Sequence, residues 1–256
     1  MPVESIQRMV PEREVSRPER AILKLSGELF MTPDRHIDFG RYDEVAKQLI
    51  EIQDKTGIQL AIVVGGGNIF RGREADGEIG HKVDNVEADN MGMLATIMNG
   101  IGLREALVRN GAKDARLMTK IGIPEIAEPY IRKKAMSHLD EGLLVIIAGG
   151  LGIPRFSTDS AVAQYAEELG CQMIFKASTV DGVYDCDPKK NSDAIKYNEL
   201  SYQDALDQRL KVMDMTAFAM CQRSGIPIFV FDINRLCDLP AIIEGDYSFG
   251  TLISGK

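Results

Sequence analysis

The chain has 256 residues, of which 45% are hydrophobic, 27% are charged and 6% are aromatic, and it contains no tryptophan. It is long enough to bury a sizeable core as one large or two small domains, and no apolar run approaches the ~18 residues that a membrane span needs. The formal net charge of -8 argues against nucleic acid as the main partner, so any site for anions must concentrate positive charge locally.

Cysteine usage and the N-terminus favour a cytoplasmic location. The cysteines Cys171, Cys186, Cys221 and Cys237 are scattered and form no CxxC pair, and residues 1–20 lack the apolar core of a secretory signal. Acids alternate with arginines in residues 1–20, which predicts a flexible extension, with a partner-contacting arm as the alternative. Residues 21–256 are predicted to form a single domain.

Apolar runs and apolar periodicity predict strands and helices that alternate along the chain. In chain order they are strand 21–25, helix 39–55, strand 59–64, helix 88–109, strand 114–118, a weak helix within 125–139, strand 143–148, a helix opened by 157–160, strand 171–177, helices 202–210 and 215–223, strand 228–231, a short helix 239–244 and a last apolar segment 251–253. This alternation implies an α/β fold with a mostly parallel sheet between helical layers.

Two features of the N-terminal half carry specific expectations. Residues 73–87 are polar and contain glycine, which predicts a mobile loop. In the long helix that follows, Met91, Leu94, Met98 and Ile101 are spaced as one helical face, and we interpret this methionine stripe as core rather than as a metal or haem feature.

Two lysines lie inside apolar strands, Lys24 in 21–25 and Lys176 in 171–177. A lysine in such a strand is costly unless its ammonium group reaches water or a site. Both lie near the carboxyl ends of their strands, where they can neutralise a phosphate. The alternative is a lysine whose stem simply runs to the solvent.

A triple glycine, Gly65-Gly66-Gly67, follows the strand 59–64, and Arg71 follows it closely. Glycines let backbone N–H groups approach an anion, and an arginine can bind phosphate oxygens with two hydrogen bonds. The pattern matches neither the Walker motif nor GxGxxG. A tight turn followed by a surface arginine is the alternative.

Polar residues at two further strand ends complete the candidate site. Ser157, Thr158 and Asp159 open a helix, where they can cap it, bind a phosphate, hold Lys24 or help position a magnesium ion. Asp89 near the start of the long helix can cap it or bind a ribose hydroxyl. The segment 181–187, with Tyr184 and Asp187, predicts either a simple hairpin or a rim that packs on a base and its sugar. His36, His81 and His138 are isolated, and no residue is predicted to ligate a metal directly.

Several strings, taken in order along the chain, resemble the amino acid kinase superfamily, and in particular its bacterial uridylate kinase branch. They are LKLSGE, VVGGGNIFRG, DNMGMLATIMN, FSTDSA, VDGVYDCDP, LKVMDMTAFAMC and GTLIS, and they cover residues 21–253. The resemblance implies a three-layer αβα sandwich, a homohexamer of catalytic domains, and magnesium-dependent transfer of the ATP γ-phosphoryl group to UMP.

The resemblance also implies a role for each matching residue. Lys24, Asp159 and Lys176 would be catalytic or support catalysis. The residues expected to bind ATP are Lys24, Leu25, Ser26, Gly27, Gly67, Arg71, Ser178, Tyr184 and Asp187. Those expected to bind UMP are Gly66, Asp89, Leu151, Gly152, Ile153, Pro154, Arg155, Phe156, Ser157 and Thr158.

The chain departs from the family pattern in the UMP loop. The family's loop usually reads TGNPFFTTD, whereas residues 151–159 read LGIPRFSTD. Leu151 and Ile153 offer no side-chain hydrogen bond to uracil, so reading of the base there must use backbone groups. Residues 32–38 also depart from a glycine-rich stretch tied to GTP activation in some relatives, which leaves allosteric control open.

Two alternative functions follow from the same residues. A kinase of this fold could act on another acceptor, such as a different nucleotide, carbamate or an isoprenoid phosphate. A non-catalytic nucleotide sensor or oxyanion-storage protein is the alternative from a different class; it predicts loss of the lysines or of FSTDS, and both are present.

Overall fold

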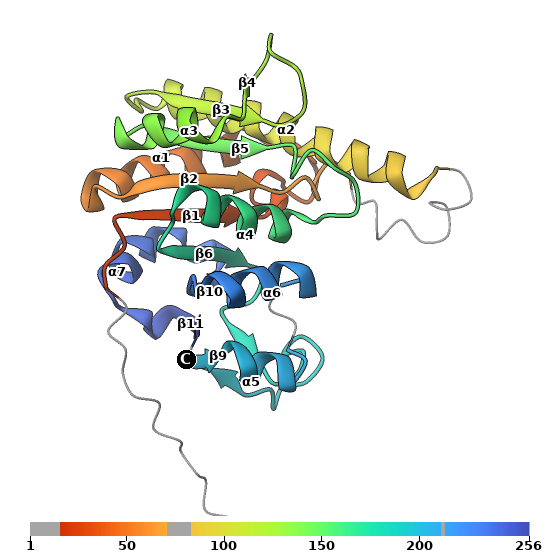
Figure 1. Ribbon diagram of the computed structural model, residues 1–256, viewed down its shortest axis with the longest axis vertical. Helices are drawn as coiled ribbons and strands as arrows, with labels where there is room; N and C mark the ends of the chain where they lie inside the picture. The colour runs from red at the N-terminus through yellow and green to blue at the C-terminus, as the bar shows by residue number, and fades with distance from the viewer. Residues whose placement is uncertain (1–15, 71–82, 211–212, 256) are drawn as a thin grey trace, which may run out of the picture.

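The computed structural model describes residues 16–70, 83–210 and 213–255. Its elements are β1 (Arg20–Leu25), η1 (Gly27–Phe30), α1 (Phe39–Thr56), β2 (Gln59–Val64), α2 (Asn85–Arg109), β3 (Ala115–Thr119), β4 (Glu128–Pro129), α3 (Arg132–Asp140), β5 (Leu144–Ala148), α4 (Thr158–Leu169), β6 (Met173–Ser178), β7 (Val183–Tyr184), β8 (Lys196–Tyr197), β9 (Glu199–Ser201), α5 (Tyr202–Asp207), α6 (Met215–Ser224), β10 (Ile228–Asp232), η2 (Ile233–Asp238), α7 (Leu239–Ile243), η3 (Tyr247–Phe249) and β11 (Gly250–Ser254), as Figure 1 shows.

Nine strands form one sheet in the order β4-β3-β5-β2-β1-β6-β10-β11-β9. Neighbouring strands in it run parallel, except that β10 and β11 are antiparallel. The central strands are continuous apolar runs because helices cover both of their faces. The prediction of an α/β fold with a mostly parallel sheet is confirmed.

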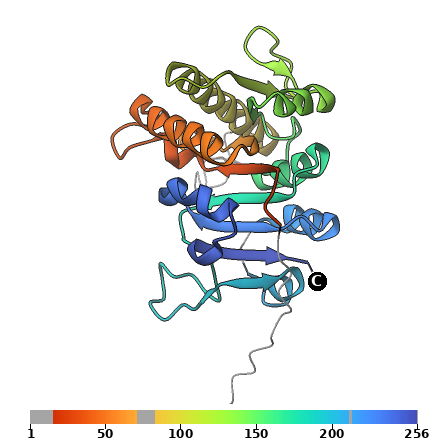
Figure 2. The same cartoon turned by 90° about the vertical axis from the view of Figure 1, so that its left-hand side faces the viewer.

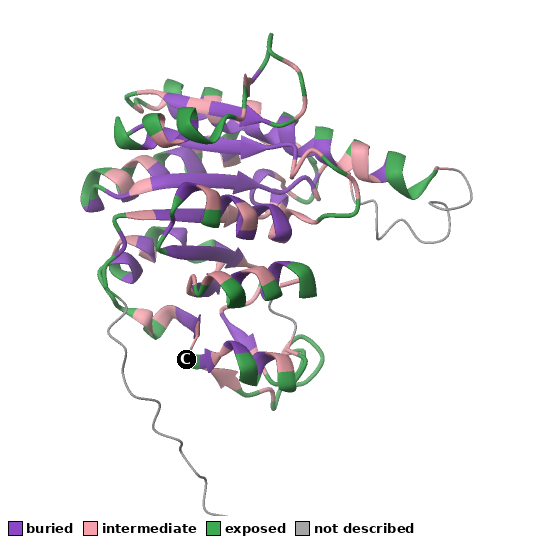
Figure 3. Cartoon of the chain, viewed as in Figure 1, coloured by how far each residue is buried: buried purple, intermediate pink, exposed green. Residues whose placement is uncertain are grey.

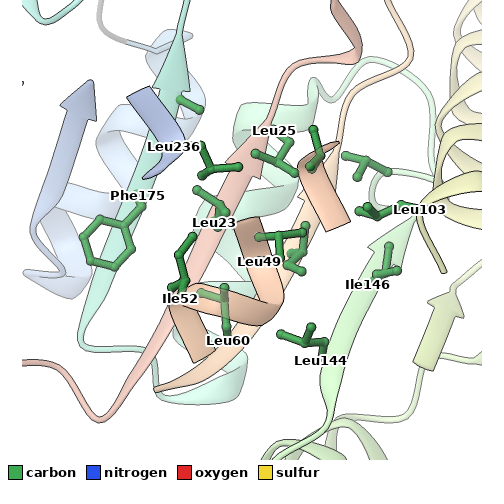
Figure 4. Close-up of a cluster of buried hydrophobic side chains, with 14 of the residues drawn as sticks. Leu23, Leu25, Leu49, Ile52, Leu60, Leu103, Leu144, Ile146, Phe175 and Leu236 are labelled. Atoms are coloured by element: carbon green, nitrogen blue, oxygen red, sulfur yellow. The ribbon is translucent and has the colours of Figure 1, made fainter. Parts of the chain in front are cut away.

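Helices cover the two faces of this sheet as separate layers (Figure 2). α1, α2 and α7 bury their apolar sides in one core cluster, and α3, α4, α5 and α6 bury theirs in another. Figure 3 shows the strands buried between the layers, and Figure 4 shows Leu49 of α1 and Leu103 of α2 packed against the sheet. The predicted three-layer αβα sandwich is therefore confirmed.

Local signals determine where the main helices begin and end. The Asp38 side chain caps α1 by accepting from Arg41 N, and Gly57 ends this helix with a left-handed φ of 65°. Ser157 caps α4 in the same way, and Gly170 ends it with a φ of 68°. Such caps satisfy backbone groups that the helix itself leaves unpaired, which is why the ends of these helices are readable in the sequence.

The methionine stripe on α2 is core only at Ile101, which packs partly buried against the cluster, and the expectation is wrong for its other three residues. Met91, Leu94 and Met98 have exposed fractions of 46%, 50% and 49%. The buried residues of α2 lie on its other side, where Ile97, Leu103 and Leu107 pack among small residues. Apolar residues occur on both the buried and the exposed side of α2, so apolar residues spaced three and four apart can be found on either side.

Three predicted boundaries also differ. The long helix begins at Asn85 rather than residue 88, because Asp84 caps it. Residues 125–139 split into edge strand β4, where Pro129 is tolerated, and α3. α5 ends at Asp207, and Arg209 takes a left-handed φ of 53°.

The first described residues are held by acids at the ends of helices. Arg17 Nε lies 2.7 Å from Glu244 Oε1, and Arg20 of β1 lies 2.5 Å from Asp140 Oδ1. Most of the stretch predicted to be a flexible extension lies outside the described residues, as do Arg71 and most of the predicted loop 73–87. Among the described helices, none is long and apolar enough to cross a membrane.

Candidate active site

The two strand lysines lie side by side across the centre of the sheet. β1 pairs with β6 in parallel, and Lys24 is directly opposite Lys176. Asp159, in the first turn of α4, lies between them: Lys176 Nζ is 2.6 Å from Asp159 Oδ2, and Lys24 Nζ is 3.8 Å from Asp159 Oδ1. The two lysines thus lie on adjacent strands, and Asp159 pairs with Lys24, which was one of the alternatives raised for this residue.

This group of three side chains is largely withdrawn from water. The exposed fractions of the Lys24, Lys176 and Asp159 side chains are 17%, 10% and 17%. Burial lowers the pKa of Lys24. Burial also disfavours the charged form of Asp159, but the nearby Lys176 and Lys24 outweigh it and lower the pKa of this carboxyl. With two lysines and one carboxylate, the group carries net positive charge, which suits a phosphate.

Two glycine turns meet beside the lysines, at the edge where β1 and β2 end (Figure 1). Gly65 N donates to Leu25 O at 2.8 Å, which joins the turns directly. A Cβ atom on Gly27 would lie 2.3 Å from Asn68 Oδ1, and one on Gly66 would lie 2.9 Å from Ala95 Cβ of α2. These glycines are therefore required by close backbone approach. Ser26, the residue before Gly27, caps η1.

A buried amide network supports the turns, and sequence reasoning missed it. Asn99 of α2 donates to Gly65 O and to Asn68 Oδ1, both at 2.7 Å, and accepts from Tyr42 Oη at 2.6 Å. Asn68 Nδ2 donates to His36 O at 2.8 Å. Asn99 is fully buried, so its polar groups rely on these partners. The string DNMGMLATIMN ends at Asn99, but it assigned this asparagine no role.

One cavity opens beside the first residues of α4. It holds about 230 Å³ and brings together seven predicted residues, which are Gly66, Gly67, Asp89, Ile153, Phe156, Ser157 and Thr158. Phe70, Thr96 and Gly150 also line it, although they were not predicted. Asp89 does not cap α2, because Asp84 does; instead its Oδ2 accepts from Arg155 N at 2.9 Å across the cavity.

The remaining residues of the predicted UMP loop do not line this cavity. Leu151 is partly buried and packs against the apolar cluster that includes the buried face of α4. Gly152 N donates to Gly149 O at 3.0 Å, Pro154 is half-buried, and Arg155 has a left-handed φ of 73° with an exposed side chain. The structure thus gives Leu151 a packing role, consistent with its aliphatic side chain.

A second cavity lies beyond β6. It holds about 310 Å³ and is lined by predicted residues Tyr184 and Asp187, together with Gly182, Cys186 and Arg209 among others. Asp181 accepts from Tyr184 Oη at 2.6 Å and pairs with Lys196 at 3.0 Å, so it holds the rim in shape. Ser178 ends β6 and does not line this cavity.

Asp214 joins α6 to the start of α4. It caps α6, and Ser157 and Ser160 both donate hydrogen bonds to its carboxylate. The string LKVMDMTAFAMC contains Asp214, but the sequence alone gave it no role. Because Asp214 is 57 residues from Ser157, only the fold could reveal this contact.

Within the described residues, no group of three or more His, Cys, Asp or Glu side chains could hold a metal ion. Asp159 Oδ1 is buried and has no hydrogen-bond partner. A cation in this site would therefore meet one protein carboxylate and depend on other ligands, such as phosphate oxygens.

Comparison with known proteins agrees with this geometry. The amino acid kinase family model matches residues 19–232. The uridylate kinase of Deinococcus radiodurans is 41% identical over 251 residues, which are 97% of this chain and 100% of that protein. The UMP kinase structure from Bacillus anthracis has a TM-score of 0.86 and 38% identity, and covers 93% of this chain and 96% of its own. The structure of UMP kinase from Ureaplasma parvum has a TM-score of 0.85 and 33% identity over 93% of this chain and 99% of its own. The chain therefore belongs to the amino acid kinase family.

Proposed function

We propose that this chain is a UMP kinase, which transfers the γ-phosphoryl group of ATP to UMP and releases ADP and UDP. The observation that carries the proposal is the group Lys24, Asp159 and Lys176, because two of its members adjoin segments that line the two cavities. Thr158, next to Asp159, lines the first cavity. β6, which carries Lys176, runs into the segment that lines the second. The first cavity would take UMP and the second the ATP nucleoside.

The reaction asks the protein for little covalent chemistry. An oxygen of the UMP phosphate attacks the γ-phosphorus of ATP while the bond to the β-phosphate oxygen breaks, so no general base is required. Lys24 and Lys176 would stabilise the negative charge on the phosphoryl group in transit, and N–H groups of the glycine turns would orient the phosphates. Asp159 would hold both lysines in place. Arg71, outside the described residues, is proposed as a further phosphate ligand.

We further propose that ATP acts as its Mg²⁺ complex. The residues fit this, because the buried Asp159 Oδ1 accepts no hydrogen bond and phosphate oxygens would supply the ligands that the protein lacks. When bound, Mg²⁺ neutralises charge on the phosphate oxygens.

The proposal includes self-association, with a homohexamer as the expected form, in the cytoplasm. Support for self-association comes from the exposed apolar stripe on α2, formed by Met91, Leu94, Met98 and Val108. Apolar side chains gathered on one helix face are typical of a surface that another protein covers. Support for a reducing compartment comes from the cysteines, all four of which are free thiols.

A coupled assay of ADP release tests the function. ATP would be held constant while UMP, CMP, dUMP, carbamate and an isoprenoid phosphate are compared as acceptors. We expect UMP to give the highest kcat/KM. A higher value for another acceptor would point to a different kinase of this fold, for which the aliphatic Leu151 and Ile153 are the motivating observation. ATP binding without turnover of any acceptor would favour the sensor.

A further inference from the structure

Tyr165 of α4 lies beneath the loop that lines the first cavity. It is fully buried, and its Oη donates to Gly150 O at 2.8 Å. Gly150 itself lines the cavity. Burial raises the pKa of Tyr165, so the phenol stays neutral and keeps the proton that it donates. The hydrogen bond thus connects the core to a backbone group at the cavity wall.

The tyrosine ring is itself held by neighbours. The rings of Tyr165 and Tyr130 lie 4.7 Å apart and are tilted by 56°. Lys120 Nζ lies 4.9 Å from the centre of the Tyr165 ring and 5.3 Å from that of Tyr130, and 3.5 Å from Glu168 Oε1. A cation over two aromatic rings adds to their packing, so the hydroxyl of Tyr165 has little freedom to move.

The loop above the tyrosine has an unusual backbone that needs such support. Gly149, Gly150 and Gly152 have φ values of 82°, 55° and 74°, and Arg155 has a φ of 73°. Glycine populates this region at little cost but also leaves it easily, so the sequence does not select one loop conformation. The described backbone anchors of the loop are Gly149 N, which donates to Thr96 Oγ1 at 2.6 Å, Gly152 N, which donates to Gly149 O at 3.0 Å, and Arg155 N, which donates to Asp89 Oδ2 at 2.9 Å. The Tyr165 bond fixes the carbonyl of Gly150.

The direction of the Gly150 carbonyl decides what the loop offers to a ligand. A trans peptide is planar, with its C=O and N–H on opposite sides. Since Gly150 O points at Tyr165 in the core, the N–H on the other side of the same peptide points the opposite way. Leu151 carries this N–H while its side chain packs against the apolar cluster, and the peptide begins at Gly150, which lines the cavity. Leu151 and Ile153 have no polar side-chain atoms, so backbone groups such as this N–H remain for reading a base. An N–H donor placed at position 4 of the base pairs with the C4 carbonyl of uracil and opposes the amino group that cytosine carries there.

We propose that Tyr165 is a positioning residue for acceptor selection, because it holds the Gly150–Leu151 peptide in the orientation that presents a donor to the nucleobase. Tyr165 does not touch the acceptor; it acts through the loop backbone. The inference rests on the proposed function in one respect, that the first cavity takes the pyrimidine acceptor.

Tyr165→Phe tests this by removing one hydroxyl while keeping the ring, its contact with Tyr130 and its contact with Lys120. We expect the ratio of kcat/KM for UMP to that for CMP to fall ~5–10-fold, about the effect of one lost hydrogen bond. KM for UMP should rise, whereas KM for ATP should stay within about twofold of the parent.

Tyr202→Phe is the matched control. Tyr202 is also buried and its Oη also donates to a backbone carbonyl, that of Ile226, but it lies on α5. This variant should lose comparable stability but keep the parent's ratio of kcat/KM for UMP to kcat/KM for CMP. If Tyr165→Phe leaves the ratio and KM for UMP within twofold, or if both variants change the ratio equally, the inference is wrong.

Two further measurements keep the outcome decisive. Should Tyr165→Phe fail to fold, Lys120→Met removes the cation from both rings and should lower the same ratio of kcat/KM values; an unchanged ratio would contradict the proposal.

Calorimetric binding of UMP and CMP repeats the comparison without turnover. If the parent prefers another acceptor, the proposed function fails by itself, and the variant's effect on UMP and CMP binding still decides the role of Tyr165. A parent that binds neither pyrimidine nucleotide overturns both.

Discussion

Lys24 and Lys176 share the carboxylate of Asp159, and this arrangement predicts how the lysines act in the reaction. Lys24→Ala removes one preorganised positive charge from the site, so kcat should fall by on the order of 10²–10³-fold. Lys113→Ala is the control, because Lys113 is exposed and donates to Glu141 O away from the site. Steady-state kinetics with ATP and UMP would measure both variants. A kcat for Lys24→Ala within a few-fold of the parent would remove Lys24 from the mechanism.

Asp159→Asn tests the electrostatics of the same group. The pKa of Asp159 is lowered in the folded state, below its ordinary value of 3.8, so the folded protein binds this proton less tightly than the unfolded chain. The carboxylate therefore contributes stability above that value, and the contribution is lost as the pH falls below it. Asp159→Asn should be destabilised at neutral pH by roughly 3 kcal/mol, because two buried lysines lose their counter-charge.

The measurement is the free energy of unfolding from urea titrations at several pH values on both sides of 3.8. The difference in the free energy of unfolding between the parent and Asp159→Asn should become smaller as the pH falls. An Asp140→Asn variant is the control, since the Asp140 side chain is 59% exposed where it pairs with Arg20. A gap for Asp159→Asn that stays constant over the whole acid range would contradict the expected coupling.

The single residues that could be predicted from the sequence are those whose side chains stand out from their neighbours in the chain. A lysine in an apolar strand and a serine at a helix start are visible without a structure, and Lys24, Lys176 and Ser157 were found in this way. Asp214, Asn99 and Tyr165 are ordinary residues for a helix or its cap. Their importance lies in contacts 15 to 57 residues away in the chain, which no local pattern encodes.

At the scale of elements, α2 connects the parts of the site. Asn99 bonds to the glycine turn, Thr96 bonds to Gly149 of the acceptor loop, and Asp89 bonds to the backbone of Arg155. Gly66 packs directly on α2. One rigid helix thus sets the distance between the two loops that border the first cavity.

Asn99→Leu should disturb this arrangement with little change in volume. It leaves Gly65 O and Tyr42 Oη without their partner in a buried position, so the glycine turn should lose its fixed geometry. We expect kcat/KM for ATP to fall about tenfold. Thr56→Val is the control, because Thr56 is buried and bonds to Ile52 O at the other end of α1. Equal kinetic losses in the two variants would show a general loss of stability instead.

The elements themselves were largely predictable, and the errors have physical causes. α1 and α4 have clear caps and glycine ends, and their predicted positions agree with the structure. α2 is apolar on nearly every side, so its periodicity could not identify the buried face. The region 125–139 contains Pro129, whose place on an edge strand depends on pairing with β3; the sequence predicts that strand but not the pairing.

At the scale of the whole molecule, alternation of strands and helices predicted the layers but not the strand order. The pairing that matters most joins β1 to β6 and brings Lys24 opposite Lys176. These strands are separated by more than half of the chain, with β2, β3, β4 and β5 between them. Alternation alone fits many strand orders, whereas the family resemblance supplied the expected fold.

The exposed face of α2 leads to a prediction about assembly. Met91, Leu94 and Met98 form an exposed apolar stripe, and transfer of such side chains from water into an interface is favourable. A carboxylate at its centre would be desolvated without a partner, so Leu94→Asp should convert the expected homohexamer into smaller species. Ile195→Asp is the control, since Ile195 is 65% exposed and lies outside α2. Light scattering after size-exclusion chromatography gives the mass of each. A Leu94→Asp variant with the mass of the parent would exclude this stripe from the interface, because a buried, unpaired carboxylate could not leave that interface intact.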